Sequence, residues 1–463
     1  MTRTRDHVEL RRAYADSVSL LQVSRDVQAT DGVVTAQVAM ATPLNLEVLG
    51  GLGFEVPTSA TAHDMVVAIR LAPDGDLAAA VAAVDRALAP ARTSSSATGE
   101  VAPPRTTASA LVDRPGLVLV SVPGPHAFVE AMDALDAGCD VMVFSDHVPL
   151  EQEVALKRVA RERGLLVMGP DCGTAVVAGL GLGFANVVRP GPVGLVAASG
   201  TGCQQLLALL DHAGVGVSSA LGLGGRDLSA DVGGLAAVEA LRRLDADDSV
   251  ELVVLVSKPP DEEVGRRIEE YAAGLATPVE QALLGPGRPD LTAVAEQVLT
   301  RLGREVPAWP VAGAARAGRG GALHGLFVGG TLCEEARLIA DAEGAGGTFV
   351  DFGDDDYTAG RAHPMIDPTL RLDQLARVGK DARTGAVLLD VVLGHGAEPD
   401  PSAALAPVLA DLEVPVVVTV VGTGDDPQDR ERQVRALVAS GAEVHLSNAL
   451  ATRRALALAG AAR

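Results

Sequence analysis

One stretch of sequence decides the fold of this chain: Pro192-Val-Gly-Leu-Val-Ala-Ala-Ser-Gly-Thr-Gly-Cys203. The apolar run Gly194–Ala198 is typical of a buried strand, and residues 204–210 have the composition and spacing of a helix. Between them, the turn Ser199-Gly200-Thr201-Gly202 would leave the first backbone N–H groups of the helix unpaired. These groups and the helix dipole, roughly half a positive charge, favour a bound phosphate or carboxylate. An ordinary turn with a serine cap is the alternative.

The composition indicates a multidomain α/β protein. A chain of 463 residues is too long for one core and predicts about three domains. Because only 2% of the residues are aromatic, the core must be built from Ala, Val, Leu and Gly, as is typical of α/β layers. The net charge of −22 argues against a nucleic-acid partner, whose phosphates would be repelled.

The same inventory predicts a cytoplasmic protein. No apolar run reaches the roughly 18 residues of a membrane span, which argues against a membrane partner. The first residues, Met1-Thr-Arg-Thr-Arg-Asp-His7, have no apolar signal core behind them. The four cysteines lack CxxC spacing and fit a reducing compartment.

Residues 1–92 predict a ferredoxin-like domain of β-α-β-β-α-β order. Alternation over Ser17–Ser24 suggests its first strand, and residues 25–30 could extend into a helix. The further elements expected are strands and helices at Val33–Met40, Pro43–Gly50, Met65–Leu71 and Leu77–Leu88. Residues 93–112 belong to a stretch rich in Pro, Ser, Thr and Ala without periodicity, which we interpret as a linker.

Residues 113–187 predict a Rossmann-like unit of parallel strands, at Leu117–Val122, Asp140–Phe144 and Leu165–Met168. The last strand is followed by Pro170 and Asp171. In open parallel sheets ligands lie at the carboxyl ends of the strands. These two residues are therefore candidates for substrate binding.

Residues 188–305 predict a second α/β unit that opens with the Ser199 turn. Its next strands end at Gly224-Gly225-Arg226 and at Lys258, so the three strand ends could converge on one anion. Arg226 offers a planar fork for phosphate or carboxylate, and Lys258 a point charge. The alternative for Arg226 is a surface salt bridge to Asp227 or Asp231.

Residues 306–321 are interpreted as a hinge. Residues 322–463 are interpreted as a further unit that repeats the pattern of residues 188–305. A strand at Leu323–Val328 turns through Gly329-Gly330-Thr331 into a helix, which makes Gly330 and Thr331 candidates for substrate binding. Within this unit Asp354-Asp355-Asp356 suggests Mg²⁺, with a solvated acidic loop as the alternative. His363, beside Arg361, is well placed to contact a ligand.

Several blocks resemble the FdrA family. They are Met168-Gly-Pro-Asp-Cys-Gly-Thr174, Ala198-Ser-Gly-Thr-Gly202, Gly224-Gly-Arg-Asp-Leu-Ser229, Val256-Ser-Lys-Pro-Pro260 and Gly360-Arg-Ala-His-Pro-Met-Ile-Asp-Pro368. More distantly, residues 113–305 are similar to the alpha subunit of succinyl-CoA synthetase, with a CoA-binding domain and a ligase domain. Residues 322–463 are similar to the ligase domain of its beta subunit. The resemblance implies two flavodoxin-like ligase domains.

In succinyl-CoA synthetase two helix N-termini face each other around a phosphate. The resemblance implies that the alpha-type helix begins here at Ser199–Gly202 and the beta-type helix at Gly394-His395-Gly396. The chain departs from that enzyme in three ways. Residues 277–287 contain no histidine to carry phosphate, no ATP-grasp nucleotide domain is present, and residues 117–125 lack a glycine-rich loop for CoA.

FdrA-type proteins also resemble the component assigned to oxamate carbamoyltransferase in allantoin breakdown. That resemblance implies conversion of oxalurate and phosphate to oxamate and carbamoyl phosphate by an oligomer with companion subunits. Arg226, Arg361 and His363 would then serve the reaction, with Arg361 and His363 across from Ser199. An acyl-CoA ligase that uses CoA is the second hypothesis, and an anion-binding scaffold without chemistry the third.

Overall fold

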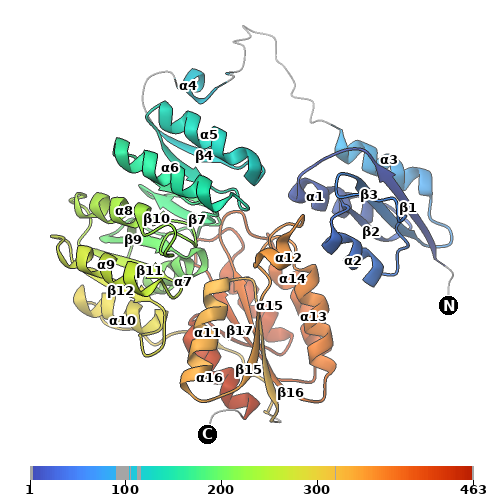
Figure 1. Cartoon of the computed structure of the whole chain (residues 1–463). Coiled ribbons are helices and arrows are strands. Elements are labelled where there is room, and N and C mark those ends of the chain that lie inside the picture. Colours follow the sequence, from blue (N-terminus) through green and yellow to red (C-terminus); the bar gives the residue numbers. More distant parts are fainter. Residues whose placement is uncertain (1–3, 90–103, 105, 112–115, 319, 461–463) are drawn as a thin grey trace. The chain divides into compact units, whose positions relative to one another are not determined.

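The computed structural model describes residues 4–89, 104, 106–111, 116–318 and 320–460 (Figure 1). The chain divides into two units. One combines the N-terminal residues, up to 101, with residues 352–370, and the other comprises residues 102–351 and 371–463. Among the described residues no helix is both long and apolar enough to cross a membrane.

The N-terminal unit contains an antiparallel sheet of order β1-β3-β2, formed by Arg5–Arg11, Met65–Leu71 and Val33–Met40. Helices α1 (Ser17–Gln28) and α3 (Leu77–Leu88) share one apolar core with this sheet. Helix α2 (Pro43–Gly51) contributes to a second cluster that includes Val66 and Ala68 of β3. Apart from the additional helix α2 between β2 and β3, the order β1-α1-β2-β3-α3 and the 1-3-2 sheet match the predicted ferredoxin-like fold, without its last strand within residues 4–89.

The predicted strand at Ser17–Ser24 is wrong, because these residues open helix α1. The buried residues Leu20, Val23, Ser24 and Val27 follow a helical period, and Asp16 caps the helix through Val18 N and Ser19 N. The true first strand, β1, was missed because its sequence, RDHVELR, is mostly charged. The other four predicted elements of this domain are confirmed.

Residues 352–370 are held to the N-terminal domain by polar contacts. Asn45 Nδ2 donates to the Gly360 carbonyl at 3.0 Å, and Arg25 donates to the Ile366 carbonyl at 3.2 Å. Asn45 lies in the first turn of α2, and its backbone N–H donates to the hydroxyl of Thr42, which caps this helix. The segment therefore belongs structurally with the first domain although it is 260 residues and more away along the chain.

The second unit begins with the predicted Rossmann-like part. Its three strands are parallel in the order β4-β5-β6, formed by Leu117–Val120, Asp140–Val143 and Val167–Met168. Helices α5 (Gly124–Asp136) and α6 (Leu150–Arg163) follow the first two strands. All three predicted strands are confirmed. Pro170, in the loop after β6, contacts Gly224 of the next domain.

The first ligase-like sheet has the order β12-β11-β9-β10-β7-β8. Its four parallel strands are β9, β10, β11 and β12, at Val193–Ala198, Val217–Gly222, Leu252–Ser257 and Val279–Leu283. The antiparallel hairpin of β7 (Thr174–Val177) and β8 (Leu180–Gly183) extends the sheet at one edge. Read in chain order, the parallel core is 2-1-3-4, as in flavodoxin-like folds.

The second sheet has the order β13-β18-β17-β16-β14-β15. Its parallel strands are β14, β15, β16, β17 and β18, at Ala322–Phe327, Gly347–Asp351, Thr384–Val392, Val416–Val421 and Glu443–His445. Strand β13 (Val311–Ala312) adds an antiparallel edge. The parallel core is 2-1-3-4-5, so the predicted repeat between the two ligase-like domains is confirmed by their topology.

Four helices form the contact between the two ligase-like domains: α7 (Gly200–His212), α10 (Leu291–Arg301), α11 (Gly330–Ala342) and α16 (Asn448–Ala459). Helix α7 is buried on every side over residues 201–210. Its two amides bridge the domains, since Gln204 and Gln205 donate to the carbonyls of Leu393 and Leu446. The helices α13 (Thr369–Lys380), α14 (Pro401–Ala410) and α15 (Arg430–Ala439) lie on the other side of the second sheet (Figure 1).

A buried charge cluster joins the Rossmann-like part to the first ligase-like domain. The Lys157 ammonium contacts Glu153 at 2.7 Å and Asp227 at 2.8 Å, and it donates to the Leu223 carbonyl at 2.9 Å. All three charged side chains are at most 1% exposed. Asp227 also accepts from Ala236 N and Ala237 N at the start of α8 (Leu235–Asp245).

We predict that Lys157→Met lowers the free energy of unfolding by about 3–5 kcal/mol, because it leaves the buried Asp227 carboxylate without a cation and leaves Glu153 with Arg226 alone. The exposed residue Lys380 offers a matched control, and Lys380→Met should change stability by no more than about 0.5 kcal/mol. Guanidinium unfolding followed by circular dichroism measures both. Equal midpoints for the two variants would show that the cluster does not stabilise the domain contact.

Candidate functional site

Ser199, in the turn after β9, caps helix α7. This cap is compatible with the anion-binding turn and with the ordinary turn that the sequence left open. Ser199 has an extended backbone, and its Oγ accepts from Gly202 N at 2.9 Å. Strand β9 is buried throughout, so the turn lies at the carboxyl end of the central strand of its sheet. The N-terminus of α7 is thereby fixed at the edge where ligands bind in this class of sheet.

Helix α11 presents its own N-terminus to the same place. The hydroxyl oxygens of Ser199 and Thr331 lie 2.6 Å apart, although 132 residues separate them in the chain. Both residues are buried. Two helix N-termini, each with unpaired N–H groups and a positive dipole end, therefore meet at one hydroxyl pair.

Glycines permit this close approach. A side chain at Gly202 would come within 2.5 Å of Ser199 Oγ and 3.0 Å of the Thr331 methyl group. A side chain at Gly329 would meet Thr201 at 2.9 Å. The turns Ser199–Gly202 and Gly329–Thr331 can therefore pack against each other because Gly202 and Gly329 have no side chain.

One cation and one carboxylate lie beside the first residue of α11. Lys258 Nζ and Asp351 Oδ2 are 2.7 and 2.2 Å from the position that a Gly330 side chain would occupy. Lys258 follows the end of β11 and is exposed, whereas Asp351 ends β15. Lys258 is therefore the predicted cation that does reach the site, and Asp351 is a site residue that sequence reasoning missed.

A second carboxylate that sequence reasoning missed, that of Asp390, accepts hydrogen bonds from the turn before α11. Asp390 accepts from Val328 N at 2.8 Å and Gly329 N at 2.9 Å, and Arg371 contacts it at 3.0 Å. Burial raises the pKa of Asp390 to about 6, against the opposing effect of Arg371. The signal was present in the sequence, because Asp390 interrupts the apolar strand β16.

A small cavity opens on the other side of the Ser199 turn. Its volume is about 20 Å³, which holds little more than one water molecule. Its lining includes the predicted residues Ser199, Gly200, Asp171, Gly224 and Gly225. Gly224 also packs against the carbonyl oxygen of Pro170. The structure thus brings these predicted residues together, in a cavity that must widen before it admits a phosphate.

Arg226 does not join this group, which corrects the expectation that three strand ends converge on one anion. Its Nε donates to Glu153 at 2.8 Å and one terminal nitrogen donates to the Val148 carbonyl at 2.8 Å. The guanidinium is therefore directed to α6 and its preceding loop. The salt-bridge alternative was closer to the structure, but its partner is Glu153 and not Asp227 or Asp231.

Arg361 and His363 belong to the N-terminal unit. The Arg361 side chain is 7% exposed and is held by Asp367 at 2.5 Å and by Asn45 at 3.2 Å. His363 Nδ1 accepts from Met365 N at 3.2 Å. Both side chains are engaged within the segment that joins the first domain, so the structure gives no support to their place across from Ser199.

The expected second helix start at Gly394–Gly396 is wrong. These residues follow β16 in a turn, and the next helix, α14, begins at Pro401. His395 is exposed, and its backbone N–H donates to the Ala185 carbonyl at 2.8 Å. The helix that faces α7 follows strand β14, the position equivalent to β9 in the repeat, so topology rather than glycine content locates it.

The acidic run at Asp354–Asp356 is exposed, and Asp354 caps the short helix α12 (Asp355–Thr358) by accepting from Asp356 N. The part of the chain that the structure describes contains no group of three or more His, Cys, Asp or Glu residues arranged to hold a metal ion. The exposure of the run is what a solvated acidic loop would show, and the Mg²⁺ hypothesis stays a prediction.

The cysteines near the site are buried thiols. Burial raises the pKa of Cys172 and of Cys203 to about 12. Cys333, in the first turns of α11, has its pKa raised by burial and then by Asp351 and Asp390. Only the thiolate is a nucleophile, so none of these thiols supports covalent catalysis at neutral pH.

We predict that Ellman's reagent at pH 8 labels the native chain far more slowly than the guanidinium-unfolded chain, in which four thiols should react, since all four cysteines are free and buried. Cys172 and Cys203 should stay protonated in the folded state even at pH 9, because pH 8 and pH 9 both lie well below their pKa of about 12. Rapid labelling of either one at pH 8, found by mass spectrometry, would contradict this.

Comparison with known proteins extends these observations. Residues 326–458 match the family described as CoA-ligase, and residues 4–104 match the family described as AllF, heavy metal-associated domain. The alpha 2 subunit of the ADP-forming succinate–CoA ligase of Archaeoglobus fulgidus is 33% identical over 36% of this chain and 56% of its own length. A dinucleotide-forming acetyl-coenzyme A synthetase of Ca. Korarchaeum cryptofilum aligns with a TM-score of 0.32 and 16% identity, over 77% of this chain and 87% of that chain.

One relative matches from end to end. The uncharacterized protein YahF of Escherichia coli K12 is 35% identical over 92% of this chain and 93% of its own length. The match spans the N-terminal domain, the Rossmann-like part and both ligase-like domains. The chain belongs to the protein family of Escherichia coli YahF.

Proposed function

We propose that this chain is a subunit of an enzyme that transfers a carbamoyl or acyl group to phosphate. The observation that carries this proposal is the meeting of the α7 and α11 N-termini at Ser199 and Thr331, 2.6 Å apart. Two hydroxyl donors, the first N–H groups of two helices and the Lys258 ammonium supply positive potential at one point. A bound phosphate would replace the hydrogen bond between the two hydroxyls, because its oxygens would accept one hydrogen bond from each of them.

The reaction we propose, of FdrA type, is that of oxamate carbamoyltransferase. A phosphate oxygen attacks the ureido carbon of oxalurate, and the carbonyl becomes a tetrahedral oxyanion. The bond from this carbon to the oxamate nitrogen then breaks, and that nitrogen takes a proton, which leaves carbamoyl phosphate and oxamate. Helix N-termini aimed at the developing oxyanion stabilise such a transition state without a covalent intermediate.

Companion subunits are part of the proposal. The cavity at Ser199 has a volume of about 20 Å³, which is far below the volume of ordinary ligand pockets. The residues that line it include no arginine for the oxalurate carboxylate, since Arg226 is bound to Glu153, and Lys258 lies beside Gly330 of α11 together with Asp351. An opening of the site and a carboxylate-binding group from a partner would complete it.

An acyl-CoA ligase of succinyl-CoA synthetase type is the second candidate. It is favoured by the CoA-ligase match over residues 326–458 and by the similarity to the succinate–CoA ligase alpha subunit. It would require CoA, a separate nucleotide-binding chain and, in the mechanism of that enzyme, a phosphorylated histidine. Residues 277–287 of this chain contain none.

We predict that Ser199→Ala with Thr331→Val weakens phosphate binding by about 1–3 kcal/mol, the contribution of hydrogen bonds to a charged acceptor. Isothermal titration calorimetry measures the affinity, and carbamoyl phosphate formed from oxalurate by the chain with its companion subunits measures turnover. The variants Ser249→Ala and Thr300→Val, at exposed positions, make the same chemical changes away from the site and should leave both quantities unchanged. Equal phosphate affinity in both double variants would place the anion elsewhere.

We further predict no acid-labile phosphoenzyme after incubation with ATP or with an acyl phosphate. His395 is the test residue, because it is exposed on the loop after β16. Phosphopeptide mapping under neutral conditions measures the product, and His395→Asn provides the control. A phosphorylated peptide containing His395, lost in that variant, would make the ligase the first candidate.

A further inference from the structure

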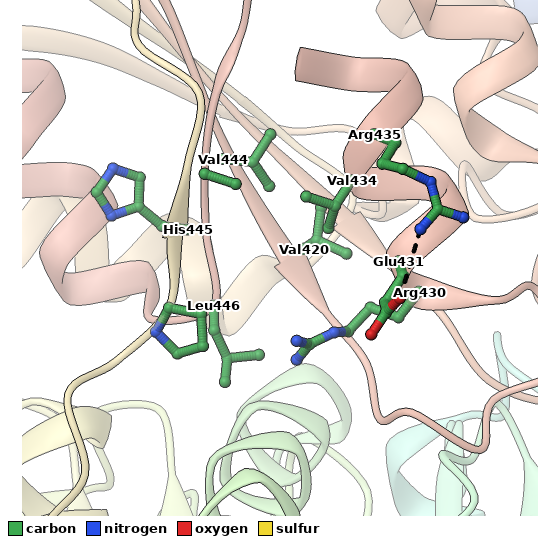
Figure 2. Close-up of a pocket in the computed structure, with 10 residues that line it drawn as sticks. Val420, Arg430, Glu431, Val434, Arg435, Val444, His445 and Leu446 are labelled. Atoms are coloured by element: carbon green, nitrogen blue, oxygen red, sulfur yellow. Dashed lines mark hydrogen bonds and ion pairs between the residues drawn. The ribbon is translucent and has the colours of Figure 1, made fainter. Parts of the chain in front are cut away.

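A second cavity lies in the C-terminal ligase-like domain, apart from the residues of the proposed phosphate site. It is bounded by strands β17 and β18, helix α15 and the segment around β13 (Figure 2). Its volume is about 260 Å³, close to the lower end of the range for small-molecule sites. A cavity of this size suits a compact ligand rather than a nucleotide or CoA.

The floor and walls of the cavity are apolar. Val420, Val434, Val444 and Leu446 lie around it in Figure 2, and Pro310 is also part of its lining. Ligand pockets commonly combine such a lining with a few polar groups that orient the ligand. The apolar lining therefore selects a ligand with a hydrocarbon portion.

The polar side chains that line this cavity are Arg430, Glu431, Arg435 and His445, and of the two arginines only Arg435 has an ionic partner among the described residues. Arg435 lies 3.4 Å from Glu431, and both side chains are exposed. No carboxylate among the described residues forms an ion pair with Arg430, which is half-buried at the start of α15. Figure 2 shows the Arg430 side chain reaching toward Leu446, while Arg435 turns toward Glu431.

Arg430 has no direct ionic partner among the described residues, and Glu431, which lines the same cavity, is paired with Arg435. His212, at the end of α7, is a further titratable group close to Arg430, and burial followed by the Arg430 charge lowers its pKa. His212 is therefore neutral at neutral pH and adds no charge of either sign. A cation beside apolar side chains, without a counter-ion, is complementary to an anionic head group attached to an apolar body.

We propose that this cavity binds a small monocarboxylate with a short hydrocarbon tail. The carboxylate accepts hydrogen bonds from the planar fork of Arg430, and the tail packs against Val420, Val434 and Val444. The site is distinct from the proposed phosphate site, because none of the residues that line this cavity belongs to the Ser199–Gly202 or Gly329–Thr331 turns. The proposal holds or fails independently of the carbamoyl transfer proposed above.

The chain carries its own reporter for this site. Trp309 is the single tryptophan of the sequence, it precedes Pro310 in the cavity wall, and its ring lies 6.1 Å from that of His212. Binding should change the intrinsic fluorescence of Trp309. The probe is hexanoate, titrated into the full chain, with 1-hexanol as the uncharged analogue and inorganic phosphate as the anion without a tail.

We expect a saturable fluorescence change with hexanoate, matched by a heat signal in calorimetry, and weaker binding of both control compounds. Arg430→Gln should reduce the hexanoate affinity about ten-fold or more, because it removes the charged donor. Arg266→Gln is the matched control, since that exposed arginine is paired with Glu270 and does not line the cavity, and it should retain the parental affinity. Val434→Phe, at a half-buried position, should block the tail without removing charge.

Several results would overturn the proposal. One is the absence of both a heat signal and a fluorescence change with hexanoate. Another is an affinity that is the same in Arg430→Gln and Val434→Phe as in the parental chain. Equal affinity for 1-hexanol would remove the role of Arg430, and equal affinity for phosphate would remove that of the apolar wall. Circular dichroism of each variant establishes that loss of binding is not loss of fold, and Val434→Phe keeps the test valid if Arg430→Gln misfolds.

Discussion

The contact between Ser199 and Thr331 is the constraint on which the second unit depends. Two helix dipoles pointing their positive ends at each other repel, so the arrangement needs compensation. The protein supplies part of it with Asp390, which accepts from Val328 N and Gly329 N, and with the Asp351 carboxylate beside Gly330. The two helix N-termini that meet here are the basis of the proposed phosphate site.

The repeated topology explains how this junction arises. In each ligase-like domain the helix after the first strand, α7 or α11, starts at the centre of its sheet edge. Packing the domains through these helices brings the two starts together. The cost is the burial of Gln204, Gln205 and Asn448, and several of their polar atoms are satisfied across the domain contact, for example by the bond from Asn448 N to Gln205 Oε1 at 3.1 Å.

Much of this architecture could be predicted from the sequence because continuous Val and Leu runs mark buried parallel strands. The stretch Pro192–Cys203 predicted β9, its turn and α7 correctly. Prediction failed where local pattern and tertiary context disagree. The alternating start of α1 imitates a strand, and the hairpin β7–β8 is short and rich in glycine, so that neither signals its structure.

The site was predicted less completely than the fold, since side-chain direction depends on distant partners. Arg226 follows a strand end as expected, but Glu153 on α6, 73 residues earlier, determines where its guanidinium points. Arg361 is held by Asn45, 316 residues away. Gly394–Gly396 resembles a phosphate-binding turn in composition, yet no helix follows it directly. By contrast, Ser199, Thr331 and Lys258 depend on backbone positions that the repeat itself specifies.

The most direct measurement of the central claim is a crystal structure of the chain grown in phosphate. The account predicts one phosphate with oxygens within hydrogen-bond distance of Ser199 Oγ, Thr331 Oγ1 and the first N–H groups of α7 and α11. Its binding would separate the two hydroxyl oxygens, which lie 2.6 Å apart without it. A structure in which these hydroxyls stay bonded to each other, with phosphate bound only at other positions, would contradict the account.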